Sequence, residues 1–270
     1  MAAADAVDDA VLAAADVEPD VAPPDPRLQL AVVFLDAGEP DAPESCKTRG
    51  PDGTLEVLVK AGRLLAGGKP TELRPGDQEA FDLLKEHADL IANSPEGQVF
   101  LARATLRAVQ TPGEALAAAQ KAVELCDWGL AHNVLGNVYQ AKGDMVKAKQ
   151  SYLRAKDREP DYLAPLMNAV LIELGDKHAK EAAALLDDIL RRKPDLAPAR
   201  LLRGQALLLS GDAAAAVVDL EVATERAPRE ANGFMLLGQA RTKTGDLDGA
   251  KAAFCKAKEL GHPAAAAKCP

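Results

Sequence analysis

A 34-residue period is the feature that most constrains the fold of this 270-residue chain. Four alanines recur at this period, each followed four positions later by a large residue and then by a further small or apolar residue. In order these are Ala148, Ala182, Ala216 and Ala250; then Tyr152, Leu186, Leu220 and Phe254; then Ala155, Ile189, Ala223 and Ala257. Each unit closes on a proline: Pro160, Pro194, Pro228 and, after His262, Pro263. Such a period indicates stacked units, because a single unit cannot cover its own apolar face.

Each unit has the pattern of two helices. Apolar or small residues recur at helical spacing over 130–141, and a second helix is expected over about 145–158. Between them Gly143-Asp144 ends one helix and caps the next. The second helix carries a small–large–small ridge, which lets the first helix lie close. Aromatic residues make up only 3% of the chain, which agrees with close-packed helices built from Ala and Leu.

The pattern resembles the tetratricopeptide repeat (TPR) family. The residues that carry the resemblance are Leu135-Gly136, Tyr139, Ala148, Tyr152, Ala155 and Pro160 in the first clear unit, and Phe234, Leu237-Gly238, Ala250, Phe254 and Ala257 in the last. The position where the family often has Trp is taken by His132, Leu166, Arg200 and Phe234. The resemblance implies an all-α fold, a right-handed α-α superhelix of antiparallel helix pairs.

The resemblance also sets the expected organisation of the chain. The solenoid spans 96–264, with a degenerate repeat at 96–128 (helices Glu96–Val109 and, with Ala115, Ala119, Ala122 and Val123, a second one) and clear repeats at 129–162, 163–196, 197–230 and 231–264. In the repeat at 163–196, Ala169-Val170 replaces the usual Leu-Gly and Gly175-Asp176 comes two residues early. A shortened first helix and a longer turn are therefore expected there. Residues 265–270 form a C-terminal tail.

Residues 27–95 resemble no known family and are expected to cap the N-terminal end of the solenoid, with a separate small domain as the alternative. The sequence predicts a helix over 27–36, a loop over 40–53, and a helix, or a strand followed by a helix, over 55–65. An amphipathic helix is predicted from Asp77 to Asn93, with Phe81, Leu84, Ala88 and Ile91 on one stripe.

Most of the formal net charge of −9 lies in residues 1–26, which contain acidic residues and no Lys or Arg. This Ala- and Pro-rich segment is expected to be a disordered arm. The acidic balance argues against nucleic-acid binding, and no apolar run reaches the length of a membrane span. The N-terminus lacks a secretory signal, which favours a cytoplasmic protein; a periplasmic or secreted one is the alternative if a signal peptide was removed before Met1.

No catalytic, metal or cofactor site can be read from the sequence. Residues 63–71 resemble a phosphate-binding loop but lack its leading Gly and its Ser/Thr, and the four histidines lie in different units. The four cysteines, Cys46, Cys126, Cys255 and Cys269, have no zinc-ligand spacing. They could be buried thiols or form two disulfides, of which Cys255–Cys269 would close the easiest loop. We therefore expect no enzyme activity and no cofactor.

The resemblance places a peptide-binding groove on the concave face, lined by the first helix of each pair. The expected groove residues are Leu130, Asn133, Asn137, Gln140, Met167, Asn168, Leu171, Leu201, Gln205, Leu208, Asn232, Met235, Gln239 and Thr242. Asn137, Gln205 and Gln239 recur in register and could bond a peptide backbone, and Met167, Leu171, Leu201 and Met235 form an apolar lane. The lane residues could equally be ordinary packing between repeats. The cationic residues of the family's chaperone-tail binders are missing, with Asn133, Pro198 and Leu202 in their places.

The predicted function is therefore that of a scaffold or adaptor that binds another protein, through a peptide or short helix, in this groove. The alternative is a structural subunit of a larger assembly that makes contacts through the convex face or the solenoid ends.

Overall fold

The computed structural model describes residues 42–47, 53–66 and 75–269, and every regular element within these ranges is helical. The expected fold class, an all-α right-handed superhelix of antiparallel helix pairs, is confirmed. The arm predicted at 1–26 and the helix predicted at 27–36 lie outside the described residues.

The helices of the repeats begin and end close to the predicted positions. The four pairs are α8 (Gly129–Ala141) with α9 (Met145–Arg158), α10 (Leu163–Gly175) with α11 (Ala179–Arg192), α12 (Ala197–Ser210) with α13 (Ala213–Arg226), and α14 (Ala231–Thr244) with α15 (Leu247–Glu259). Before them come η2 (Glu44–Cys46), α3 (Thr54–Leu65), α4 (Pro75–Glu86), α5 (Ala88–Ile91), α6 (Pro95–Ala104), the π-helical η3 (Thr105–Val109) and α7 (Pro112–Leu125); η4 (Pro263–Ala265) follows them. The degenerate repeat is thus the pair α6–η3 and α7, with Ala115, Ala119 and Ala122 fully buried as expected.

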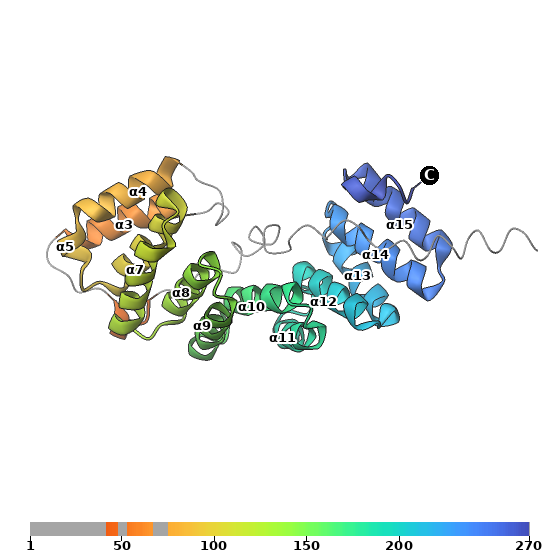
Figure 1. Ribbon diagram of the computed structural model, residues 1–270, viewed down its shortest axis with the longest axis horizontal. Helices are drawn as coiled ribbons and strands as arrows, with labels where there is room; N and C mark the ends of the chain where they lie inside the picture. Colours follow the sequence, from red (N-terminus) through yellow and green to blue (C-terminus); the bar gives the residue numbers. More distant parts are fainter. Residues whose placement is uncertain (1–41, 48–52, 67–74, 270) are drawn as a thin grey trace, which may run out of the picture.

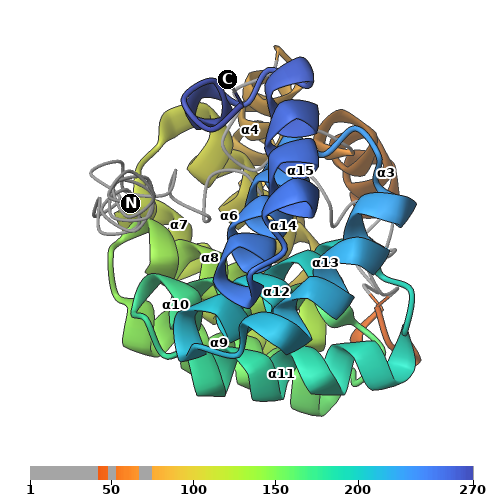
Figure 2. The ribbon, with the colours of Figure 1, turned by 90° about the vertical axis from the view of Figure 1, so that its right-hand side faces the viewer.

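The pairs follow one another along an arc. In Figure 1, α8, α10 and α12 lie along its upper, inner side, and α9 and α11 lie below them on the outer side. Figure 2, viewed from the α15 end, places α9 and α11 on the same outer side. In the pairs α8–α9 and α10–α11 the first helix therefore faces the inside of the arc and the second faces outward.

Three of the four pairs are held together by a glycine that faces the large residue of the ridge. A Cβ atom on Gly204 would lie 2.5 Å from Leu220, and one on Gly238 would lie 2.5 Å from Phe254; Gly136 meets the Tyr152 ring in the same way. Because real Cβ atoms do not approach this closely, only glycine lets these helices pack at this separation.

The expectation for the repeat at 163–196 holds only relative to the last two repeats. Helix α10 has 13 residues and a three-residue turn follows it, as with α8, whereas α12 and α14 have 14 residues and two-residue turns. Lys177 stands where the other three repeats have a turn glycine and takes the same left-handed conformation, with φ 62° against 80° at Gly143. The turn is kept because the helices on both sides are fixed by burial: Val170, Leu186 and Ile189 are all fully buried in one cluster.

The N-terminal region differs from its prediction in one helix. Residues 54–65 form a single helix, α3, which excludes the strand alternative. The helix predicted over 77–93 is divided at His87 (φ −107°, ψ 30°), and Ala88 is exposed rather than on the apolar stripe. Ala80, Leu84 and Ile91 are fully buried and share a cluster with Ala104 of α6, because the break turns Ile91 toward α6.

A buried ion pair links this region to the degenerate repeat. Arg107 Nη1 donates to the Leu65 carbonyl oxygen at 3.0 Å and lies 3.4 Å from Asp77 Oδ1. Asp77 is 0% and Arg107 8% exposed, so each charge depends on the other for compensation. The pair joins α3, α4 and η3.

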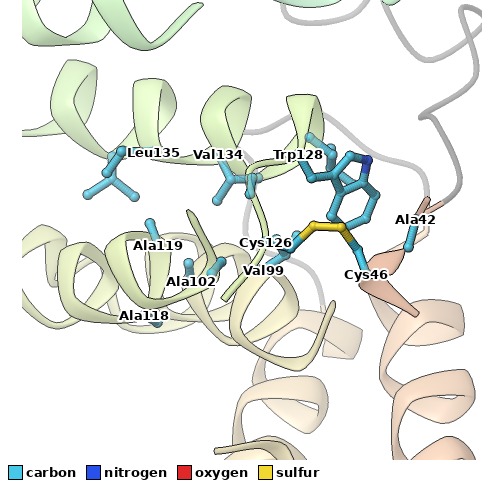
Figure 3. Packing of buried hydrophobic residues seen from close by; sticks show 14 of the residues in the cluster. Ala42, Cys46, Val99, Ala102, Ala118, Ala119, Cys126, Trp128, Val134 and Leu135 are labelled. Carbon is cyan, nitrogen blue, oxygen red and sulfur yellow. A yellow bond between two sulfur atoms is a disulfide. The ribbon is translucent and has the colours of Figure 1, made fainter. Parts of the chain in front are cut away.

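All four cysteines are paired. Cys46 bonds Cys126 across 80 residues of sequence, and Cys255 bonds Cys269 across 14; the Cα–Cα distances of 5.6 and 4.9 Å suit disulfides. Figure 3 shows the Cys46–Cys126 bond beside the Trp128 ring, with Ala42 on the same side. Ala42, Cys46 and Trp128 belong to one buried cluster with α6–α8, so the disulfide fastens residues 42–47 to the start of the repeats.

The residues after α15 pack against it. Ala265 of η4 is fully buried, Cys269 is 8% exposed, and Lys258 Nζ donates to the Cys269 carbonyl oxygen at 3.0 Å. They share a cluster with Phe254 and Ala257, so the described part of the predicted tail covers the end of the last pair.

Candidate functional site

The outer side of the third repeat is closed by ion pairs. Asp219 on α13, only 2% exposed, accepts from Arg200 Nη1 at 2.7 Å and from Arg203 Nε at 2.5 Å. Arg203 also reaches Asp187 on α11 at 2.7 Å. The hydrogen bond that Arg203 donates to Asp219 is the main cause that raises the pKa of Arg203 above its ordinary value. These arginines mark the face of α12 that points outward, between α11 and α13.

The opposite face of α12 is the inner one. At about 100° of rotation per residue, Pro198, Gln205 and Leu209 lie on the side of α12 opposite Arg203 and away from Gly204, which faces α13. Gln205 and Pro198 are half-buried, and Leu209 is 51% exposed. Since the repeats share one register, the same positions of α8, α10 and α14 lie on this inner face.

Several predicted amides hydrogen-bond one another across the first two repeats. Asn133 Nδ2 donates to Tyr162 Oη at 2.9 Å, and its Oδ1 accepts from Asn168 Nδ2 at 3.2 Å. Asn168 Nδ2 also lies 3.4 Å from Asn137 Oδ1. These bonds hold α8 and α10 together, so Asn133 and Asn168 have largely structural roles.

The same network continues to the ridge tyrosine. Tyr152 Oη lies 2.9 Å from Asn137 Oδ1 and 2.6 Å from Gln140 Oε1. A phenol has one proton, so one of these amides turns its NH₂ group toward the hydroxyl oxygen. Burial raises the pKa of Tyr152 above its ordinary value, which keeps the hydroxyl protonated. Because Asn137 Oδ1 also accepts from Asn168, Gln140 is the amide that turns, and Asn137 Nδ2 then has no hydrogen-bond partner among the described residues.

The predicted apolar lane lies within the packing between repeats. Met167 is 0%, Leu171 3%, Met235 5% and Leu201 8% exposed, and Leu130 is buried with them. Each belongs to a cluster shared by neighbouring helices. These side chains therefore offer a ligand little surface in this conformation.

Asn137, Gln140 and Asn168 are half-buried but hydrogen-bonded to neighbouring side chains, so the partly accessible residues of the predicted set without such bonds lie on α12 and α14. Gln205, Leu208, Asn232 and Gln239 are half-buried and Thr242 is exposed. None of the described residues forms a hydrogen bond with the side-chain amide of Gln205 or Gln239. We call these two glutamines together with Leu209 the inner patch.

Sequence reasoning missed Leu209, the most exposed apolar residue on the inner face. It lies one turn after Gln205, so the spacing that selected Gln205 could have found it.

Sequence reasoning also missed a hollow of about 370 Å³ on the outer side of the last repeat, between α13 and α15. Phe234 and Leu237 form its floor, Ala252 and Ala253 one wall, and Glu221 and Glu225 lie along the other. Phe234 and Leu237 stand where the preceding repeat has Arg200 and Arg203. The 34-residue register therefore holds a signal: two ion-pairing arginines of one repeat are replaced by apolar residues in the next, although the ion pair between Arg241 and Glu221 also lines the hollow.

The other polar clusters are structural in their contacts. His132 Nε2 lies 2.7 Å from Asp127 Oδ1, and Arg158 pairs with the other oxygen of that carboxylate. The hydrogen bond from Arg158 is the main cause that lowers the pKa of Asp127 below its ordinary value. Among the described residues, no group of His, Cys, Asp or Glu could hold a metal ion, and no helix is long and apolar enough to cross a membrane.

Comparison with known proteins agrees with this architecture. The tetratricopeptide repeat family model matches residues 131–162 and 231–260. A heat shock protein sti1 homologue from Schizosaccharomyces pombe is 35% identical over 102 residues, a match that covers 37% of this chain and spans only 16% of that protein.

Solved structures show the same fold at low sequence identity. MamA from Desulfovibrio magneticus RS-1 is 20% identical and has a TM-score of 0.56, covering 62% of this chain and 94% of that one. YrrB, described as a TPR protein with an unusual peptide-binding site, is also 20% identical with a TM-score of 0.56, covering 67% and 93%. With the 34-residue register and the four helix pairs, these likenesses lead to one conclusion: the chain contains tetratricopeptide repeats, which the family model matches at residues 131–162 and 231–260, and it folds as a helical solenoid like those of MamA and YrrB.

Proposed function

We propose that this protein is a non-enzymatic adaptor that binds a peptide or short helix of another protein on the inner face of its repeats. The observation that carries the proposal is the inner patch: two glutamine amides without hydrogen-bond partners among the described residues, one repeat apart, beside an exposed leucine.

The chemistry of the patch suits a polypeptide. An amide side chain offers both a donor and an acceptor, so Gln205 and Gln239 can pair with the C=O and N–H groups of an extended chain. Leu209 offers an apolar contact between these polar ones. Asn137 adds a further amide along the same face, and the buried residues of the predicted groove, such as Met167 and Leu171, pack beneath these polar side chains.

The test compares capture by inner-face and outer-face variants. The inner-face variant is Gln205→Ala with Leu209→Glu. Leu201 is left unchanged, because it packs between repeats. The outer-face control is Lys147→Glu with Gln150→Glu on α9, where both side chains are exposed. We expect wild type and control to capture a common partner segment, mapped by cross-linking, and the inner-face variant to lose it with its melting temperature unchanged. Equal loss from both variants would refute the proposal.

A second candidate function, that of a subunit in a larger assembly, is favoured by the hollow between α13 and α15. Its floor of Phe234 and Leu237 could accept an apolar side chain from an outer-side contact. Ala252→Arg, at an exposed position that lines the hollow, would block that contact without changing the inner patch. Loss of partner capture by this variant alone would select the second candidate.

We also propose that the protein works in an oxidising compartment. The two disulfides favour the periplasmic or secreted alternative, because cytosolic thiols are kept reduced. Peptide mapping of the protein purified from its native source, under non-reducing conditions, tests this. Free Cys46 and Cys126 would favour the cytoplasm.

A further inference from the structure

We infer that the segment bound by the inner face is uncharged at the positions where it contacts the repeats. This inference rests on the proposed function, because it specifies the partner of the same face.

The inner face has almost no ionisable residues. From α8 to α14 the positions that share the inner register are Leu130, Asn137, Ala141, Ala164, Leu171, Gly175, Pro198, Gln205, Leu209, Asn232, Gln239 and Lys243. Only Lys243, in the last turn of α14, carries a charge. Charged residues form 27% of the whole chain, so this face is depleted of them.

The charges of the same helices are directed elsewhere. Arg200 and Arg203 turn outward to Asp219, and Arg241 turns outward to Glu221 at 2.8 Å. Glu173 of α10, 5% exposed, is held by Lys149 of α9 at 2.8 Å. Helices α10 and α12, and α14 apart from Lys243, therefore place their charged side chains against the second helices, and α8 contains no Asp, Glu, Lys or Arg.

A charged ligand side chain would lose hydration on this face without gaining a counter-ion. Burying an unpaired charge costs far more than burying an amide that finds a partner. Backbone groups and amides of a ligand would instead be satisfied by Gln205 and Gln239, and an aliphatic side chain would cover Leu209. The face thus selects a neutral segment with an apolar residue, and its affinity should depend little on salt.

The experiment is a selection from a displayed random 12-residue peptide library against the full, oxidised chain, followed by titration of the synthetic peptides that are enriched. The test variant is Gln205→Glu with Gln239→Glu, which keeps side-chain size and adds two carboxylates to the inner patch. The charge-matched control is Gln120→Glu with Gln150→Glu, two exposed positions on the second helices α7 and α9.

We expect enriched peptides without Asp, Glu, Lys or Arg at the positions required for binding. Their affinity should fall at least tenfold in the test variant, stay within twofold in the control, and change less than about twofold between 50 and 500 mM salt. Peptides that require a charged residue and still depend on Gln205 and Gln239 would overturn the inference while leaving the proposed function intact. If no enriched peptide depends on the inner patch, the proposed function fails as well.

Discussion

The pair α10–α11 and the pair α12–α13 have the same backbone fold but hold it by different means. The pair α12–α13 has all the local signals: Gly204 against Leu220, Gly211 in the left-handed turn position and Asp212 as the N-cap, which accepts from the Ala215 backbone N–H at 3.1 Å. The pair α10–α11 has Val170, Lys177 and His178 at these positions.

The difference shows where the second repeat obtains its stability. Helix α10 is buried over most of its length between the repeats on either side, whereas α12 keeps half-buried and exposed positions along two faces. Fully burying one Leu or Val contributes about 1.5–3 kcal/mol, and an L-residue in the left-handed conformation costs about 1–2 kcal/mol. Burial therefore outweighs the missing glycine and cap. The following substitutions test this comparison, from the largest expected effect to the smallest.

The close approach of α12 to α13 should be the most sensitive feature. Gly204→Ala places a Cβ atom 2.5 Å from Leu220 and should lower the free energy of unfolding by about 1–3 kcal/mol. The control is Gly113→Ala on α7, whose new Cβ meets nothing within 4 Å. Urea denaturation followed by circular dichroism measures both. A Gly204→Ala protein as stable as the control would mean that the pair can separate freely.

Exchanging the turn residues should shift stability in opposite directions. Gly211→Lys forces a side chain to adopt φ near 90° and should cost about 1–2 kcal/mol. Lys177→Gly relieves the same strain at φ 62° and should stabilise by up to about 1 kcal/mol. The measurement is the melting temperature, which should fall below that of wild type in Gly211→Lys and rise above it in Lys177→Gly. Movement in the same direction would contradict the account of the turn.

Removal of the N-cap side chain should destabilise the pair α12–α13, which has a capping hydrogen bond, more than the pair α10–α11, which has none. Asp212→Ala removes the acceptor for the Ala215 N–H and should cost about 0.5–2 kcal/mol. His178 makes no capping hydrogen bond, although its ring contacts Glu173. His178→Ala should therefore lower the free energy of unfolding by less than Asp212→Ala does. Hydrogen exchange of the first-turn amides of α11 and α13 checks this, with faster exchange expected in α13 alone.

Glu173, the buried carboxylate of α10, should make the stability of the protein depend weakly on pH in the acid range. Burial raises the pKa of Glu173, but hydrogen bonds from Lys149 and His178 outweigh it and lower that pKa below its ordinary value. Its contribution to stability is therefore present above the unfolded value of about 4.3 and lost as pH falls through the folded value. The melting-temperature difference between wild type and Glu173→Gln should shrink below about pH 4. A difference that grows there would show the opposite sign.

Much of the fold could be predicted from the sequence, because the signals of a repeat are local. The 34-residue period, the Gly-Asp turns and the small–large–small ridge placed α8 and α9 to within a residue. They also identified the family and the inner positions, since a helix presents the same register of residues wherever it stands in the stack.

The tertiary structure decided what each of these positions does. Periodicity cannot distinguish a residue that packs between repeats from one that faces solvent, so Leu201 and Met235 were expected in the groove while Leu209 was missed. The partner of Cys46 lies 80 residues away, a distance at which sequence spacing carries no information. The length of α10 was likewise decided by its burial, which overrode the turn signal at Gly175-Asp176. The sequence thus determined the path of the backbone, and contacts between distant segments determined which side chains remain available on its surface.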